Sequence, residues 1–171
     1  LELCRRKEGK SCTCHESGHG KLISTFYIAA EHVFFMSEKQ RGIYLERYPF
    51  LDKNTSILSS VFDIGDLSQI ESLRKIREKD GHNEKWAIVD GNSWIKGVQE
   101  AASFLEEMDE PYDIVGGLSY NDLLRKLSKY KGLAARPLGH DTCPRLVIEA
   151  KMLGLELLLN QNVQHAEEEW F

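Results

Sequence analysis

The chain has 171 residues, which is enough for one ordinary domain or for one domain and part of another. With 42% hydrophobic and 29% charged residues, it has the composition of a soluble globular protein, which excludes a disordered or fibrous chain. The net charge of −5 and the lack of a long basic run argue against a nucleic-acid-binding protein, and the apolar stretches are too short for a transmembrane segment.

The first half of the chain shows apolar patterns of both helices and strands. In chain order we expect a loop (1–20), a helix (21–30), a short buried run (32–36), a helix ending near residue 47, a strand (55–62) and a helix (67–79). Ser37-Glu38-Lys39-Gln40 has the form of a capping box, so Ser37 is expected to cap the second helix, which Pro49 then stops. The last of these helices is expected to bury one stripe, formed by Leu67, Ile70, Leu73 and Ile76.

From residue 86 onward the pattern alternates regularly between strands and helices. The expected strands are 86–89, 112–115, 133–135 and 155–159, and the expected helices are 95–108, 119–129 and 144–153. Strands separated by single helices predict an α/β fold with a parallel sheet. Such sheets bind ligands at the carboxyl ends of their strands, so the loops that follow the strands are the places to look for chemistry.

The loop after the first of these strands has the composition of a phosphate-binding turn. Its candidate residues are Gly91, Asn92, Ser93, Lys96 and Gly97. Glycine and small polar residues let backbone amides approach a phosphate, and a lysine adds a positive charge. Taken alone, however, Lys96 is more often a solvated surface lysine.

The loop after the third strand leads into a second candidate anion site. Pro144 suits a first helical turn that Asp141 or Thr142 can cap, and the free amide groups of that turn attract anions. Arg145 supplies a forked donor suited to phosphate oxygens, and Glu149 lies further inside the helix. The alternative is that Asp141 is only a cap and Glu149 only a solvated helix residue.

Together these residues resemble a known family. Asp141-x7-Glu149, followed by Ala150 and Gly154, resembles the E-x7-E signature of retaining GT-B glycosyltransferases of the family-4-like group, with Asp in place of the first Glu. Residues 92–97 are similar to the lysine-glycine phosphate loop of that group. The segments 35–40, 58–63 and 141–151 resemble a bacterial and archaeal subgroup of these glycosyltransferases.

The resemblance implies a role for each candidate residue. Glu149 corresponds to the acid that hydrogen-bonds the ribose of the nucleotide, Asp141 to the acid near the donor sugar, and Lys96 to the lysine that offsets the diphosphate charge. Many members carry an arginine shortly before that lysine, which this chain lacks, and Arg145 is the candidate to replace it. The resemblance implies Asp141, Lys96 and Glu149 as catalytic residues. It also predicts that the turn preceding Pro144 and the turn holding Lys96 converge on a common pocket for a pyrophosphate. The implied donor-binding set is Gly91, Asn92, Ser93, Lys96, Gly97, His140, Asp141, Thr142, Cys143, Arg145 and Glu149.

The resemblance also implies an architecture and a reaction. Residues 1–63 would be the end of an acceptor-side α/β domain, 64–85 a crossover helix or linker, and 86–171 a Rossmann-like GT-B donor domain. We therefore expect part of an enzyme. Because the four cysteines are too few and too unevenly placed for a disulfide framework, we expect a cytoplasmic setting, with peripheral binding at the inner membrane face as an option. It would transfer a sugar from a donor such as a UDP- or GDP-sugar to a sugar, lipid-linked or other acceptor. The resemblance also implies that the configuration of the transferred sugar is retained, and that the reaction needs neither a metal nor a further cofactor.

Two other interpretations stay open. The second half could be a Rossmann-like module that binds a nucleotide or phosphate without catalysis. Alternatively, Cys4, Cys12, Cys14, His15 and His19 could hold zinc and organise an interaction domain, although no C-x2-C pair is present and a solvated loop is the simpler interpretation. Cys143 lies at a helix start, where thiols are activated, but it is interpreted as a packing residue.

Overall fold

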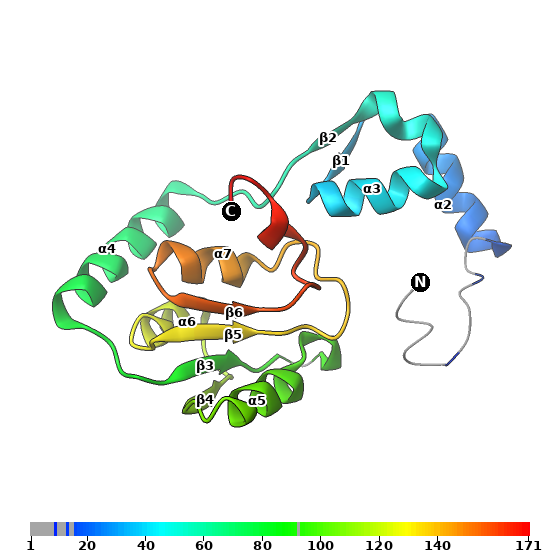
Figure 1. Ribbon diagram of the computed structural model, residues 1–171. Coiled ribbons are helices and arrows are strands. Elements are labelled where there is room, and N and C mark those ends of the chain that lie inside the picture. Colours follow the sequence, from blue (N-terminus) through cyan, green and yellow to red (C-terminus); the bar gives the residue numbers. More distant parts are fainter. Residues whose placement is uncertain (1–8, 10–12, 14–15, 92) are drawn as a thin grey trace. The chain divides into compact units, whose positions relative to one another are not determined.

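The computed structural model describes residues 9, 13, 16–91 and 93–171, and it divides the chain into two compact units, Leu1–Ser59 and Ser60–Phe171 (Figure 1). The division falls a few residues before the expected boundary at residue 63. Residues 64–85, expected to be a crossover helix or linker, belong to the second unit and contain its first helix.

The first unit contains two strands and their connecting helices. Its elements are α2 (Gly18–Ala29), β1 (Val33–Phe35), α3 (Glu38–Arg47), the 3-10 helix η2 (Pro49–Asn54) and β2 (Thr55–Ile57). The strands are parallel, with Val33 opposite Thr55. The predicted cap is confirmed, because Ser37 Oγ accepts a hydrogen bond of 3.0 Å from the backbone N–H of Gln40.

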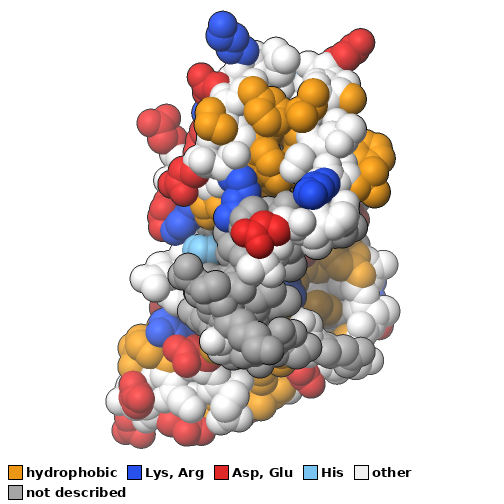
Figure 2. Space-filling view, turned by 90° about the vertical axis from the view of Figure 1, so that its right-hand side faces the viewer, with side chains coloured by type: hydrophobic (Ala, Val, Ile, Leu, Met, Phe, Trp, Pro, Cys, Tyr) orange, Lys and Arg blue, Asp and Glu red, His pale blue; other side chains and the backbone are white. Residues whose placement is uncertain are grey.

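Two expectations for this unit are wrong. The strand predicted over 55–62 ends at Ile57, because the backbone N–H of Leu58 bonds to the last residue of β1, Phe35, and no partner strand extends further in the described part of the chain. The run 32–36 is not buried as a whole: Phe35 is 3% exposed, whereas Phe34 is 59% exposed. A strand with only one covered face buries alternate residues. Hydrophobic side chains gather on the surface in the upper part of Figure 2, and the exposed ones of this unit include Leu22, Phe26 and Ile28 of α2, Phe34 of β1 and Phe50 of η2.

The second unit is a four-stranded parallel sheet with helices on both faces. In chain order its elements are α4 (Ile64–Asp80), β3 (Trp86–Val89), the 3-10 helix η3 (Trp94–Lys96), α5 (Val98–Glu107), β4 (Tyr112–Val115), α6 (Tyr120–Leu127), β5 (Gly132–Ala135), α7 (Arg145–Met152), β6 (Glu156–Leu159) and the 3-10 helix η4 (Gln164–Glu167). All strand pairs are parallel, in the order β4-β3-β5-β6. This confirms the predicted α/β class and is compatible with a Rossmann-like arrangement.

The helices move from one face of the sheet to the other where the order of strand addition reverses. From β3 the chain moves outward to β4 through α5, and from β4 it returns past β3 to β5 through α6. One core cluster joins the sheet to α4, α6 and α7, and the other joins it to α5. Crossovers of one hand produce this arrangement. The switch point lies between β3 and β5, and ligands bind outside the carboxyl ends of strands at such a point.

Three local predictions in this unit need correction. The helix predicted over 95–108 is divided into η3 and α5 by Gly97, whose φ is +67°. The cap of α7 is Pro144, with no side-chain hydrogen bond, so Asp141 and Thr142 do not cap it. In α4 the predicted apolar stripe is buried only at Ile70 and Leu73: Leu67 is 40% and Ile76 53% exposed, and Arg77, at 7%, is buried instead. Among the described residues, no helix is both long and apolar enough to traverse a bilayer.

Candidate functional site

The two loops that follow β3 and β5 are in direct backbone contact. The backbone N–H of Leu138 donates to the carbonyl oxygen of Ile95 at 2.8 Å. Gly97 lies so close to the second loop that a Cβ atom there would be 2.0 Å from the carbonyl oxygen of Arg136. The predicted convergence of the two candidate loops is therefore present in the structure, at the switch point of the sheet.

The side chains of Lys96 and Asp141 meet across these loops. Lys96 Nζ lies 2.8 Å from Asp141 Oδ2, with side chains 48% and 19% exposed. The backbone of Asp141 is held in turn, because its N–H donates to Asn162 and its carbonyl oxygen accepts from Gln164. The loop after β6 thus fixes the position from which the Asp141 carboxylate faces the lysine.

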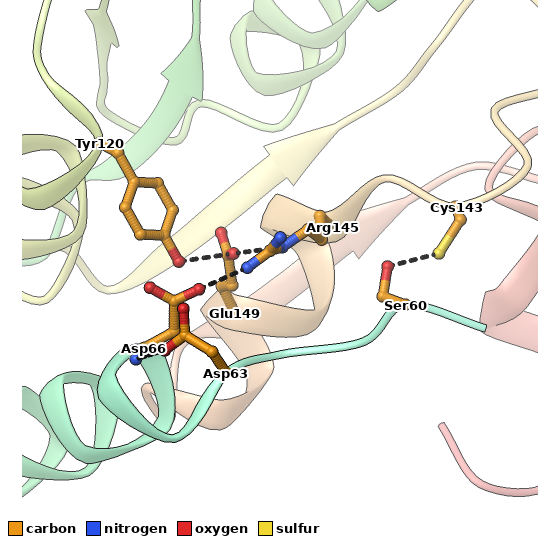
Figure 3. A network of polar contacts seen from close by, with 7 residues as sticks. All are labelled: Ser60, Asp63, Asp66, Tyr120, Cys143, Arg145 and Glu149. Carbon is orange, nitrogen blue, oxygen red and sulfur yellow. Dashed lines mark hydrogen bonds and ion pairs between the residues drawn. The ribbon is translucent and has the colours of Figure 1, made fainter.

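Glu149 lies at the centre of a second polar network (Figure 3). Its side chain is 2% exposed, and its Oε1 accepts from the Tyr120 hydroxyl at 2.8 Å and from Arg145 Nε at 3.2 Å. Arg145 also donates through Nη2 to Asp66 Oδ2 at 2.7 Å, and its guanidinium lies 4.6 Å from the centre of the Phe62 ring. The start of α4 with its preceding segment, the start of α6, and α7 therefore meet in one polar network.

The electrostatics of the network act on Tyr120 and Arg145. Burial and the hydrogen bond to Glu149 raise the pKa of Tyr120 to about 12, so its hydroxyl stays a donor at neutral pH. Burial lowers the pKa of Arg145, but the hydrogen bond to Asp66 and the charge of Glu149 outweigh that effect, and its pKa is raised. Arg145 is consequently a permanent cation with two of its nitrogens occupied by carboxylates.

The other predicted donor-binding residues lie along the same loops. Gly91 faces the Lys96 side chain, which a Cβ would approach to 3.8 Å, and Ser93 precedes η3 without a side-chain cap bond. His140 is exposed and Thr142 half-buried. Cys143 Sγ lies 2.9 Å from Ser60 Oγ, in hydrogen-bond contact with the segment before α4. Asn92 lies outside the described residues.

The proposed zinc cluster lies largely beyond what the structure describes. Cys4, Cys12, Cys14 and His15 are outside the described residues, as is the side chain of His19. Within the described ranges, no group of three or more His, Cys, Asp and Glu side chains is placed to hold a metal ion.

Sequence reasoning missed three parts of the site. Tyr120 follows β4 at the carboxyl edge of the sheet, so the rule that selected the other two loops could have found it. Asp66 is 79 residues from Arg145, and no local pattern links the two. His165 is fully buried near Asp141, and neither of its ring nitrogens has a hydrogen-bond partner within the described structure.

Comparison with models of known protein families finds no match, and comparison with curated proteins finds none either. The interpretation of the site therefore depends on its residues and their geometry.

Proposed function

We propose that the second unit binds the nucleotide-diphosphate part of a sugar donor and that the protein is a retaining glycosyltransferase of the GT-B type. The observation that carries the proposal is the contact of Lys96 with Asp141 across two loops at the switch point of a parallel sheet. A mobile cation and a carboxylate at that place suit a phosphate and a sugar hydroxyl, respectively.

The chemistry assigns different tasks to the two acids. When the bond between the sugar and the diphosphate breaks, negative charge develops on the diphosphate oxygens, and a nearby cation stabilises it. Lys96, half-exposed at the end of a flexible side chain, can leave Asp141 and contact those oxygens. Asp141 is then free to accept a hydrogen bond from the donor sugar, and Glu149 accepts from the ribose.

Titration calorimetry with UDP, GDP and ADP tests the binding step. Lys96→Met should weaken binding of the preferred nucleotide by about 10-fold or more, because a charge-assisted hydrogen bond contributes about 1.5–3 kcal/mol. Lys85→Met is the matched control, since Lys85 is also 48% exposed and also lies 2.8 Å from a carboxylate, that of Asp113. Equal affinities of the Lys96 variant and the unmodified chain would refute the assignment.

A second assay separates an enzyme from a module that only binds. The chain that binds a nucleotide is incubated with the corresponding nucleotide sugars, and release of the nucleoside diphosphate is measured with and without candidate sugar and lipid-linked acceptors. Acceptor-dependent release that Lys96→Met abolishes would support transfer. Tight binding without any release would favour the non-catalytic module.

A further inference from the structure

The hydrogen bonds of Glu149 are unevenly distributed over its two oxygens. Both protein donors, the Tyr120 hydroxyl and Arg145 Nε, converge on Oε1 (Figure 3). Oε2 has no hydrogen-bond partner among the described residues, yet it is not among the fully buried polar atoms that lack one. One oxygen therefore fixes the carboxylate, and the other is left as a reachable acceptor.

An ionised carboxylate offers about four acceptor positions, and buried polar groups are rarely left without partners. With the Glu149 side chain 2% exposed, bulk water covers Oε2 only in part. A donor from a ligand, such as a hydroxyl group, would complete its hydrogen bonding. A sugar hydroxyl suits this acceptor better than a phosphate does, because a phosphate oxygen would add a second negative charge.

We infer that Tyr120 is a positioning residue, which holds Glu149 through Oε1 so that Oε2 accepts a hydrogen bond from a ribose hydroxyl of the bound nucleotide. The inference rests on the proposed function. It deepens that function, because Tyr120 would then make the chain prefer ribonucleotides over nucleotides that lack the ribose hydroxyls.

Tyr120 differs from Arg145 as a support for this carboxylate. Its hydroxyl is the nearer donor, at 2.8 Å against 3.2 Å. Arg145 lies on the same helix as Glu149, four residues before it, whereas Tyr120 begins α6 and follows β4. The tyrosine therefore ties the carboxylate to a separate element of the sheet edge, and this tie fixes the side chain's rotamer relative to a ligand placed there.

The test compares Tyr120→Phe with the unmodified chain by calorimetry, using UDP, GDP and ADP and their 2′,3′-dideoxy analogues. The unmodified chain should prefer its ribonucleotide over the dideoxy analogue by about 10-fold or more, the loss expected when a charged acceptor is left unpaired. In Tyr120→Phe that preference should fall to about 3-fold or less, with little change for the dideoxy analogue. A tyrosine that only supports the fold would weaken both ligands equally.

Tyr112→Phe is the matched control, because the Tyr112 hydroxyl also bonds to a glutamate, Glu106, at 2.7 Å and lies in the preceding strand. It should leave the preference unchanged. In a Glu149→Ala background, Tyr120→Phe should have no further effect on the preference, since its action passes through that carboxylate. This second comparison stays informative if Tyr120→Phe lowers stability.

The outcomes separate the inference from the proposal on which it rests. Binding of ribonucleotides with an unchanged preference in Tyr120→Phe overturns the role of Tyr120 and leaves donor binding intact. Equal binding of ribo- and dideoxynucleotides by the unmodified chain overturns the inference together with the ribose contact of Glu149, and it leaves binding of the diphosphate intact. If the unmodified chain binds none of the nucleotides, the proposed function fails, and the inference fails with it.

Discussion

Gly97 is the residue whose replacement should show most directly how closely the two loops pack. Its φ of +67° lies in the left-handed region, where an alanine costs about 1–2 kcal/mol. A Cβ would also lie 2.0 Å from the carbonyl oxygen and 2.9 Å from the carbonyl carbon of Arg136, so the loop after β5 would have to move. Overpacking of this kind costs about a further 1–3 kcal/mol. We therefore expect Gly97→Ala to lower the free energy of unfolding by about 2–5 kcal/mol.

Gly117→Ala isolates the steric part of this loss. Gly117 has a φ of +69°, but nothing lies within 4 Å of a Cβ placed there, so its replacement should cost only the backbone contribution. Urea unfolding followed by tryptophan fluorescence is the assay, because all three tryptophans, Trp86, Trp94 and Trp170, belong to the second unit. Gly97→Ala should also weaken nucleotide binding, since Lys96 is its neighbour. Equal destabilisation by the two alanines would refute the close packing of the loops.

Two further predictions concern buried groups outside the loops. Arg77→Met should lower the free energy of unfolding by about 3 kcal/mol or more in the same assay. The reason is that the carbonyl oxygens to which Arg77 donates would lose their donor; they belong to Ser128, Tyr130, Lys131 and Gly154. The control variant Lys79→Met should change the free energy of unfolding little. Burial lowers the pKa of His165 from its usual 6.5, although the charge of Asp141 partly opposes this effect. The unfolded chain therefore binds a proton below pH 6.5 that the folded chain does not, so stability should fall as the pH drops from 7 to 5.5, by at most about 1.4 kcal/mol per pH unit for one proton. His165→Phe should have a smaller pH dependence over that range, and an identical one would contradict the assignment.

The sheet of the second unit could be predicted because its strands are short apolar runs separated by polar turns and by helices with clear caps. The strands at 86–89 and 112–115 agree with the prediction to the residue. The misplaced boundaries lie where distant contacts decide the backbone. The helix expected from residue 95 is interrupted because Gly97 packs against Arg136. The strand expected to reach residue 62 ends at Ile57, because its pairing with β1 ends there.

In the candidate site, too, features encoded locally could be predicted, and features that depend on distant contacts could not. The loops of Lys96 and Asp141 were predicted to converge because both follow strands at the carboxyl edge of one parallel sheet, and their side chains are in contact. The same rule could have selected Tyr120, which follows β4, but it does not predict the contacts around Glu149. Tyr120 and Asp66 lie 29 and 83 positions from Glu149 in the sequence, and the packing of the helices decides whether their side chains reach this network.

The ion pairs of Lys96 and of Arg145 differ in how easily a ligand can displace them. Lys96 and Arg145 face Asp66, Asp141 and Glu149, so these five side chains carry a charge of +2 − 3 = −1, and the proposed diphosphate would need a cation that leaves its carboxylate. The pair of Lys96 with Asp141 is partly exposed, and such pairs contribute about 0–1 kcal/mol, less than a charge-assisted bond to phosphate. Releasing Arg145 would instead leave the Glu149 carboxylate, 2% exposed, without its nearest cation, which is costly for a buried charge. Lys96 is therefore the cation free to follow a ligand, while Arg145 stays with the acid that it helps to hold.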